Sequence, residues 1–97
     1  MVRVVPSVLY PVEGGDKILL TCTTDIDNPE SYEWYKNDTK VVSASGQSLD
    51  IGNSASSDGE YKCNVVNGTD KSAHSAGEMI SFKSMYLSIF LDTWSAR

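Results

Sequence analysis

The sequence predicts an all-β fold built from short strands. Short runs in which apolar and polar side chains alternate are separated by clusters of Gly, Asn, Asp, Ser and Pro. No segment sustains the 3.6-residue period of a helix. The two cysteines, Cys22 and Cys63, both fall on the inward-facing phase of predicted strands. Together these observations indicate an all-β domain whose two cysteines point into the core.

The first strand is predicted in two pieces, over residues 2–5 and 8–12. Pro6 and Pro11 bracket the break, and proline cannot donate to a ladder, so this strand belongs at an edge. The break is consistent with an edge strand that crosses from one sheet to the other. After a glycine turn, the second strand is predicted over residues 17–24.

The middle of the chain carries three further predicted strands, over residues 31–36, 49–51 and 59–66. In the first of them the alternation turns Tyr32 and Trp34 inward and turns Glu33 and Tyr35 outward. The third places Cys63 on its inward face.

The C-terminal part is less regular. Residues 67–77 are predicted to form a loop, after which Ile80 and Phe82 fit one strand phase and residues 85–91 fit the opposite phase. A change of phase by one residue turns every side chain to the other face, so only one stretch is expected to close the sheet unless a bulge intervenes. We favour the later stretch, 84–91. The chain is then one domain over residues 1–97 with its core in 2–91, and 92–97 form a tail or the start of an interdomain junction.

Charge and hydrophobicity restrict the class of protein. The chain has 8 Lys and Arg against 13 Asp and Glu, a formal net charge of -5, and its basic residues are scattered. Nucleic-acid binding is therefore disfavoured. No stretch approaches the roughly 20 apolar residues of a membrane span. No signal peptide is recognised at the N-terminus, so a secreted protein would be present here as a mature ectodomain fragment with an added Met1.

The two cysteines permit one intrachain bridge. For so long a loop the chain-entropy model credits such a bridge with roughly 4 kcal/mol. Disulfides persist in secretory compartments and not in a reducing cytosol, so an oxidised pair would indicate an extracellular or cell-surface location.

Cys22, then Trp34 in the run Tyr-Glu-Trp-Tyr-Lys, then Asp58-Gly59-Glu60-Tyr61-Lys62-Cys63 together resemble the immunoglobulin superfamily. The resemblance implies that Cys22 and Cys63 join the two sheets, that Trp34 packs on the sulfurs, and that the Tyr61 hydroxyl bonds to the preceding corner. Only about a dozen residues separate the third predicted strand from the fourth. This is too short for the additional hairpin of variable-type domains. The resemblance therefore implies a C2- or I-type β-sandwich of two antiparallel sheets with about seven to eight strands.

Within that superfamily, residues 48–51 followed by 58–63, and residues 86–90 followed by Asp92 and Trp94, resemble the first domain of Fc-receptor-like cell-surface receptors. The segment between Cys63 and Met85 is longer than in those domains, and Fc binding is not carried over because that surface lies chiefly on the following domain. The resemblance implies that Trp94 packs against a following domain, the alternative being an exposed tail residue.

Two sequons occur, at Asn37-Asp38-Thr39 and at Asn67-Gly68-Thr69, both where a turn is predicted. We expect glycosylation of at least one of the two asparagines. The alternative is that these residues serve only the chemistry of their turns.

Catalysis is not indicated, because the sole histidine, His74, lies in a stretch of small residues and no nucleophile has an identifiable base. We therefore expect neither an enzyme nor a cofactor. The acidic run from Asp25 to Glu30 contains oxygen ligands of the kind that calcium prefers, but its spacing matches no known calcium loop. A solvated loop is the expected role, and no metal site is predicted.

Two surfaces are candidates for contact with another protein. One is the long segment 64–83, and the other is the outward side of the strand that contains Trp34, where neighbouring outward residues are expected to meet across paired strands. The candidate contact residues are Glu33, Tyr35, Lys62, Asn67, His74 and Trp94.

Recognition of another protein is the expected function, and three kinds of protein are in competition. The first is a module of a cell-surface immune-type receptor, with further domains in the full-length chain. The second is a homophilic cell-adhesion domain, which would dimerise through the Tyr35 face. The third is an intracellular structural domain of the muscle type, with reduced cysteines.

Overall fold

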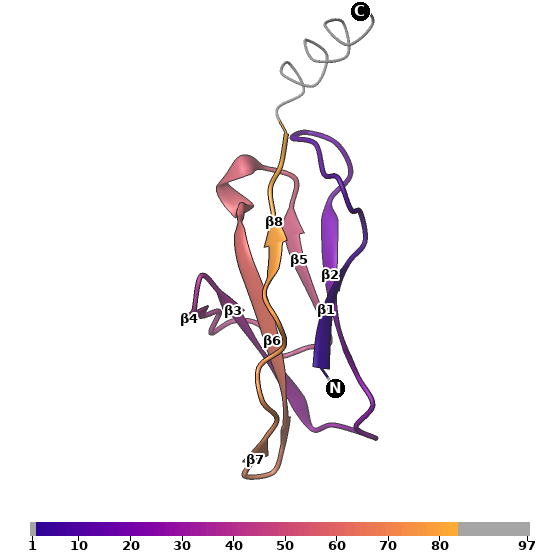
Figure 1. The fold of residues 1–97 in the computed structure, drawn as a ribbon, viewed down its shortest axis with the longest axis vertical. Coiled ribbons are helices and arrows are strands. Elements are labelled where there is room, and N and C mark those ends of the chain that lie inside the picture. The colour runs from indigo at the N-terminus through magenta and orange to yellow at the C-terminus, as the bar shows by residue number, and fades with distance from the viewer. Residues whose placement is uncertain (1, 84–97) are drawn as a thin grey trace, which may run out of the picture.

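The computed structural model describes residues 2–83. Its strands are β1 (Val2–Pro6), β2 (Ile18–Thr24), β3 (Ser31–Lys36), β4 (Thr39–Lys40), β5 (Ser48–Gly52), β6 (Gly59–Asn67), β7 (Asp70–Lys71) and β8 (Glu78–Ile80), with a 3-10 helix, η1 (Ala55–Ser57), before β6. Within these residues, one sheet has the order β1-β2-β5 and the other the order β4-β3-β6-β7, with β8 also paired to β6 (Figure 1). Every pairing between these strands is antiparallel. The prediction of an all-β sandwich of two sheets is confirmed.

A disulfide between Cys22 and Cys63 links the two sheets, because β2 belongs to one and β6 to the other. The indole of Trp34 is fully buried in the same core cluster as the two sulfurs, and its Nε1 donates a hydrogen bond to the carbonyl of Gly46 at 2.8 Å. A buried indole N–H needs such a partner. The roles that the sequence implied for these three residues are those that the structure shows.

The turn before β6 is fixed by two side chains of the Asp-Gly-Glu-Tyr-Lys-Cys run. The Tyr61 hydroxyl donates to the carbonyl of Ser57 at 2.6 Å, as expected from the sequence. Oδ1 of Asp58 accepts from the backbone N–H of Phe82 at 2.7 Å. Asp58 thereby attaches the chain beyond β8 to the turn that begins β6.

The N-terminal strand crosses between the sheets, as its prolines predict. β1 pairs with β2 in one sheet, whereas Val12 forms a parallel bridge with Lys83 beside the other. The Lys83 N–H donates to the carbonyl of Pro11 at 3.1 Å, and the Glu13 N–H donates to the carbonyl of Lys83 at 2.8 Å. This contact holds the last described residue against the second half of the crossing strand.

The edge of β6 is closed by β7 and β8, and the preference for residues 84–91 as the closing strand is therefore wrong. β8 pairs with the start of β6 and β7 with its end. Ile80 and Phe82, the residues of the earlier phase, are buried in the core. The stretch 84–91 lies outside the described residues, as does Trp94.

The expectation of a loop over residues 67–77 holds for 72–77, which form no strand, but misses the two-residue strand β7 and the two serine side chains that bond to β6 between β7 and β8. The Ser72 N–H donates to the carbonyl of Val65 while its hydroxyl accepts from the Val65 N–H at 2.8 Å. Ser75 and Cys63 make the same reciprocal pair, with the Cys63 N–H donating to the Ser75 hydroxyl at 3.0 Å. Each hydroxyl takes the place of a backbone carbonyl in an antiparallel ladder.

The serine pairs also explain why residues 72–75 lack the alternation of a strand. The chain takes three residues from Ser72 to Ser75 while β6 takes two from Val65 to Cys63, so the strand bulges and its alternation is lost. A serine-rich stretch without alternation is typical of a loop.

Replacing Ser75 with alanine is expected to lower the free energy of unfolding by about 1–3 kcal/mol, because the buried Cys63 N–H would lose its acceptor. Urea denaturation measures the change. The matched variant is Ser45→Ala, at a serine for which no side-chain hydrogen bond is found among residues 2–83. A Ser75→Ala protein as stable as Ser45→Ala would contradict the role of the hydroxyl in the ladder.

Candidate functional site

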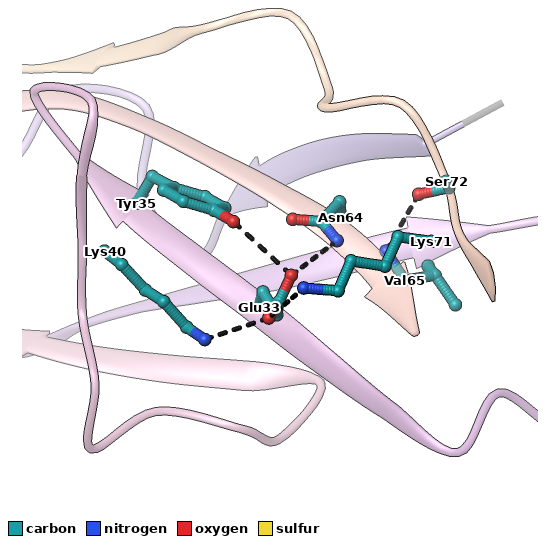
Figure 2. Close-up of polar contacts among 7 residues, drawn as sticks. All are labelled: Glu33, Tyr35, Lys40, Asn64, Val65, Lys71 and Ser72. Atoms are coloured by element: carbon teal, nitrogen blue, oxygen red, sulfur yellow. Dashed lines mark hydrogen bonds and ion pairs between the residues drawn. The ribbon is translucent and has the colours of Figure 1, made fainter. Parts of the chain in front are cut away.

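The outer face of the second sheet carries a cluster of polar side chains centred on Glu33 (Figure 2). Glu33 of β3 lies opposite Asn64 of β6, and the Asn64 Nδ2 donates to Oε1 of Glu33 at 3.0 Å. The other carboxylate oxygen, Oε2, accepts from two ammonium groups, Lys40 at 2.9 Å and Lys71 at 3.2 Å. Strands β4, β3, β6 and β7 therefore each contribute one member of the cluster.

Hairpin geometry explains how Lys40 reaches this cluster. Asn37 and Asp38 form the turn between β3 and β4 with φ of 51° and 65°. Two positive φ values in a two-residue turn are typical of a type I′ hairpin, which Asn and Asp tolerate. The turn pairs Lys40 with Tyr35, so its side chain lies on the same face as Glu33.

Glu33 and Asn64 are buried although they face away from the core. Only 8% of Glu33 and 1% of Asn64 is exposed. The rings of Tyr35 and His74 lie 4.3 Å apart, centroid to centroid. Tyr35 belongs to β3, His74 lies between Ser72 and Ser75, and β6 runs between them, so the two rings meet above β6. Asn64 is the outward residue of β6 directly opposite Glu33.

The electrostatics of the cluster favour the ionised carboxylate. The hydrogen bond from Asn64, followed by that from Lys40, lowers the pKa of Glu33 from 4.5 to about 2. In turn the hydrogen bond to Glu33 raises the pKa of Lys40. Within the described part of the chain, Oδ1 of Asn64 has no hydrogen-bond partner.

An apolar groove adjoins this face. It has a volume of about 630 Å³ and runs between the start of β1 and the segment that links β7 to β8. Val2, Ile26, Ala73 and Ala76 supply apolar surface to its walls, and His74 lines it as well. His74 therefore belongs both to the ring pair on the sheet face and to the groove. We call the Glu33 cluster, the ring pair and this groove together the His74 surface.

The structure brings some of the predicted contact residues together and separates others. Glu33, Tyr35 and His74 meet on the His74 surface. Lys62 lies directly opposite Tyr35 in the pairing of β3 with β6, as predicted, and its Nζ is 3.1 Å from Oδ1 of Asp38, an interaction that raises the Lys62 pKa. Asn67 ends β6 at the two-residue turn into β7.

Sequence reasoning did not single out Lys40 and Lys71 as members of the site. The Asn-Asp turn could have indicated Lys40, because a two-residue hairpin fixes which residues lie opposite each other. The sequence holds no such signal for Lys71, since its strand was expected to be a loop.

The two sequon asparagines differ in their surroundings. Asn67 is exposed at the tip of the β6–β7 hairpin. Asn37 is also exposed, but its Oδ1 accepts from the Glu60 N–H at 3.0 Å, and its amide lies 3.0 Å from the point where Gly59 would carry a Cβ. Among residues 2–83 no group of three or more His, Cys, Asp or Glu side chains is arranged to hold a metal ion.

Comparison with known families identifies the class of protein. A family model described as an immunoglobulin domain matches residues 2–67, which span β1 to the end of β6. The chain therefore belongs to the immunoglobulin domain family. Domains of this family generally bind other proteins and are not catalytic. No curated protein matches the chain. Within residues 2–83, no helix combines the length and hydrophobicity needed to cross a membrane.

Glu33 should make stability depend on pH in the acidic range. Its folded pKa of about 2 lies below its ordinary value of 4.5, so the unfolded chain takes up the proton first. The ionised Glu33 therefore contributes fully to the free energy of unfolding above about pH 4.5, and this contribution is lost as the pH falls to about 2. At neutral pH, Glu33→Gln should lower the free energy of unfolding by about 1.5–3 kcal/mol, the value for hydrogen bonds to a charged group.

Urea denaturation across this pH range measures both effects. The variant should show a shallower decrease in stability than the wild type, whereas Glu30→Gln, at an exposed position, should retain the wild-type slope. Identical pH profiles for wild type and Glu33→Gln would contradict the assigned role of Glu33.

Proposed function

We propose that this single domain is a protein-recognition module of a cell-surface immune-type receptor and that it binds its partner through the His74 surface. The observation that carries the proposal is the ring pair of Tyr35 and His74, held over a buried polar cluster beside an apolar groove.

The arrangement suits binding because its parts are already ordered. Glu33 is held by three strong donors, and the ring of Tyr35 rests against that of His74. Side chains fixed before binding lose less entropy when a partner arrives. Tyrosine is also a frequent anchor of protein interfaces, and a groove of this volume is large enough to receive a partner's apolar side chains.

The extracellular setting is supported by the disulfide and by the two sequons. A disulfide-bonded immunoglobulin domain fits such a location. The receptor class rests on the likeness of residues 48–51 and 58–63, and of residues 86–90 with Asp92 and Trp94, to Fc-receptor-like first domains. The family match supports the immunoglobulin domain alone. The receptor proposal includes further domains in the full-length chain. Adhesion between like cells and a muscle-type structural role are the alternatives that the experiments below distinguish.

Expression through a secretory pathway tests the proposed extracellular location. We expect secreted protein whose mass rises on reduction by one pair of hydrogen atoms, and a glycan that Asn67→Gln removes because Asn67 is exposed at its hairpin tip. Asn37→Gln should leave that glycan in place. Free thiols without glycan would contradict the receptor proposal and favour the intracellular structural domain.

Binding of the multivalent domain to a panel of cell-surface ectodomains tests whether the His74 surface contacts a partner. For an ectodomain that binds wild-type protein, Tyr35→Ala and His74→Ala should each weaken affinity by about tenfold or more, which corresponds to about 1.4 kcal/mol. Leu19→Ser, on the other sheet and 43% exposed, should bind like wild type.

The same panel distinguishes the alternatives. Equal binding by all variants would contradict the assignment of the His74 surface. Binding to the chain itself, with dimerisation that Tyr35→Ala abolishes, would replace the receptor proposal with homophilic adhesion.

A further inference from the structure

One asparagine differs from the others both in its neighbour along the chain and in its place in the fold. Asn67 ends β6 and is directly followed by Gly68, the first residue of the two-residue turn into β7 at one end of the sandwich (Figure 1). Asn67 is exposed, and among residues 2–83 neither its side chain nor the Gly68 N–H has a hydrogen-bond partner. The side-chain amide and the next backbone nitrogen are therefore both accessible to reaction.

Gly68 leaves the approach to its nitrogen open. Its φ of 68° lies in the left-handed region that glycine adopts without strain, and a Cβ built on it would meet nothing within 4 Å. Glycine itself carries no side chain beside the nitrogen. When that nitrogen meets Cγ of Asn67, the two close a five-membered ring, which is the size that forms most readily.

Hydrogen bonds or burial hold three of the other asparagines. Oδ1 of Asn37 accepts from the Glu60 N–H at 3.0 Å, and Nδ2 of Asn53 donates to the carbonyl of Gly15 at 2.8 Å. Only 1% of Asn64 is exposed. A side-chain amide held in place must first leave its partner before it can meet the next backbone nitrogen, so these three asparagines are expected to react slowly.

The remaining asparagine, Asn28, is exposed but precedes Pro29. A proline nitrogen carries no hydrogen, so it cannot lose a proton and become the nucleophile. Of the five asparagines in the sequence, all within residues 2–83, Asn67 therefore alone combines an unrestrained amide with a reactive neighbour.

We propose that Asn67 is a site of spontaneous deamidation. The Gly68 nitrogen loses its proton to base and attacks Cγ of Asn67. The new C–N bond closes a succinimide ring, and the bond from Cγ to Nδ2 breaks and releases ammonia. Water then opens the ring at either carbonyl and gives aspartate or isoaspartate. In total one water is consumed, one ammonia is released and the chain gains one negative charge at neutral pH.

The inference does not rest on the proposed function, because it requires neither a partner nor a receptor. A glycan on Nδ2 of Asn67 would be attached to the leaving group. The reaction therefore concerns chains that carry no glycan at this residue.

The new charge would lie opposite an existing one. Asn67 pairs with Asp70 across the hairpin, and like charges directly opposite each other destabilise a strand pair. Isoaspartate would also insert a methylene group into the backbone of the hairpin. β7 has only two residues, and the second, Lys71, donates to Oε2 of Glu33. Deamidation is therefore expected to weaken the attachment of β7 to β6 and to the Glu33 cluster.

Ageing of the full chain tests the inference. Protein made without glycosylation, with the bond between Cys22 and Cys63 formed, is incubated in its folded state in heavy-oxygen water at mildly alkaline pH. Peptide masses and fragmentation are followed with time. We expect the peptide with Asn67 to lose ammonia and take up one oxygen from the solvent, as both aspartate and isoaspartate. The aged protein should bind more tightly to an anion exchanger and unfold at a lower urea concentration than fresh protein.

Gly68→Asn is the matched variant, because asparagine tolerates a φ of 68° while its side chain crowds the attacking nitrogen. It should deamidate at Asn67 severalfold more slowly than wild type. Asn37 and Asn53 serve as internal references in the same samples. Denatured wild-type chain at the same pH gives the rate without any restraint from the fold, and folded protein should react at Asn67 within severalfold of that rate.

Three results would overturn the inference. They are an unchanged Asn67 in folded protein when the denatured chain reacts, reaction at Asn37 or Asn53 as fast as at Asn67, and a product that contains aspartate without isoaspartate. An aged protein with the urea midpoint of fresh protein would overturn the expected effect on β7.

Discussion

The bond between Cys22 and Cys63 fixes β2 of one sheet against β6 of the other, and the remaining structure is arranged around this connection. Trp34 packs into the same cluster from β3, the strand that pairs with β6 along six residues. The inward side of β6 is therefore occupied by the core. On this sheet, a partner can therefore contact β6 only through the side chains on its outward side and at its far edge.

At the far edge of β6, the hydroxyl groups of Ser72 and Ser75 determine the position of His74. Ser72 and Ser75 continue the ladder across the gap between β7 and β8, and the strand bulges between them. His74 lies within this bulged stretch, opposite Tyr35. A regular strand would present side chains only in strict alternation, whereas the bulge sets His74 over the sheet face and leaves small side chains beside the groove. This irregularity places the groove next to the ring pair and the Glu33 cluster, and so joins the parts of the His74 surface.

The Glu33 cluster illustrates why burial on an outer face need not destabilise a domain. Removing a carboxylate from water is costly unless strong donors replace the water. Here Asn64 and two lysines supply them, while the lysine side chains remain 49% and 58% exposed and so lose little of their own hydration. Surface ion pairs with such exposure contribute little stability individually. Their main effect is on the positions of the strands, because the Glu33 carboxylate on β3 bonds to side chains of β4, β6 and β7.

The sequence by itself determined the two-sheet class, the inward cysteines and Trp34, the Tyr61 corner and the crossing first strand. These follow from local alternation, proline chemistry and a motif that is recognised by its residue types and their spacing along the chain. Only the tertiary structure decided which late stretch closes the sheet, that Asn64 and Glu33 are buried, and that Lys71 and His74 reach β3. Those facts depend on contacts between residues far apart in the sequence, including hydrogen bonds from serine side chains to the backbone of β6. The residues next to these serines in the sequence do not distinguish a serine that bonds to a strand from a serine in a loop.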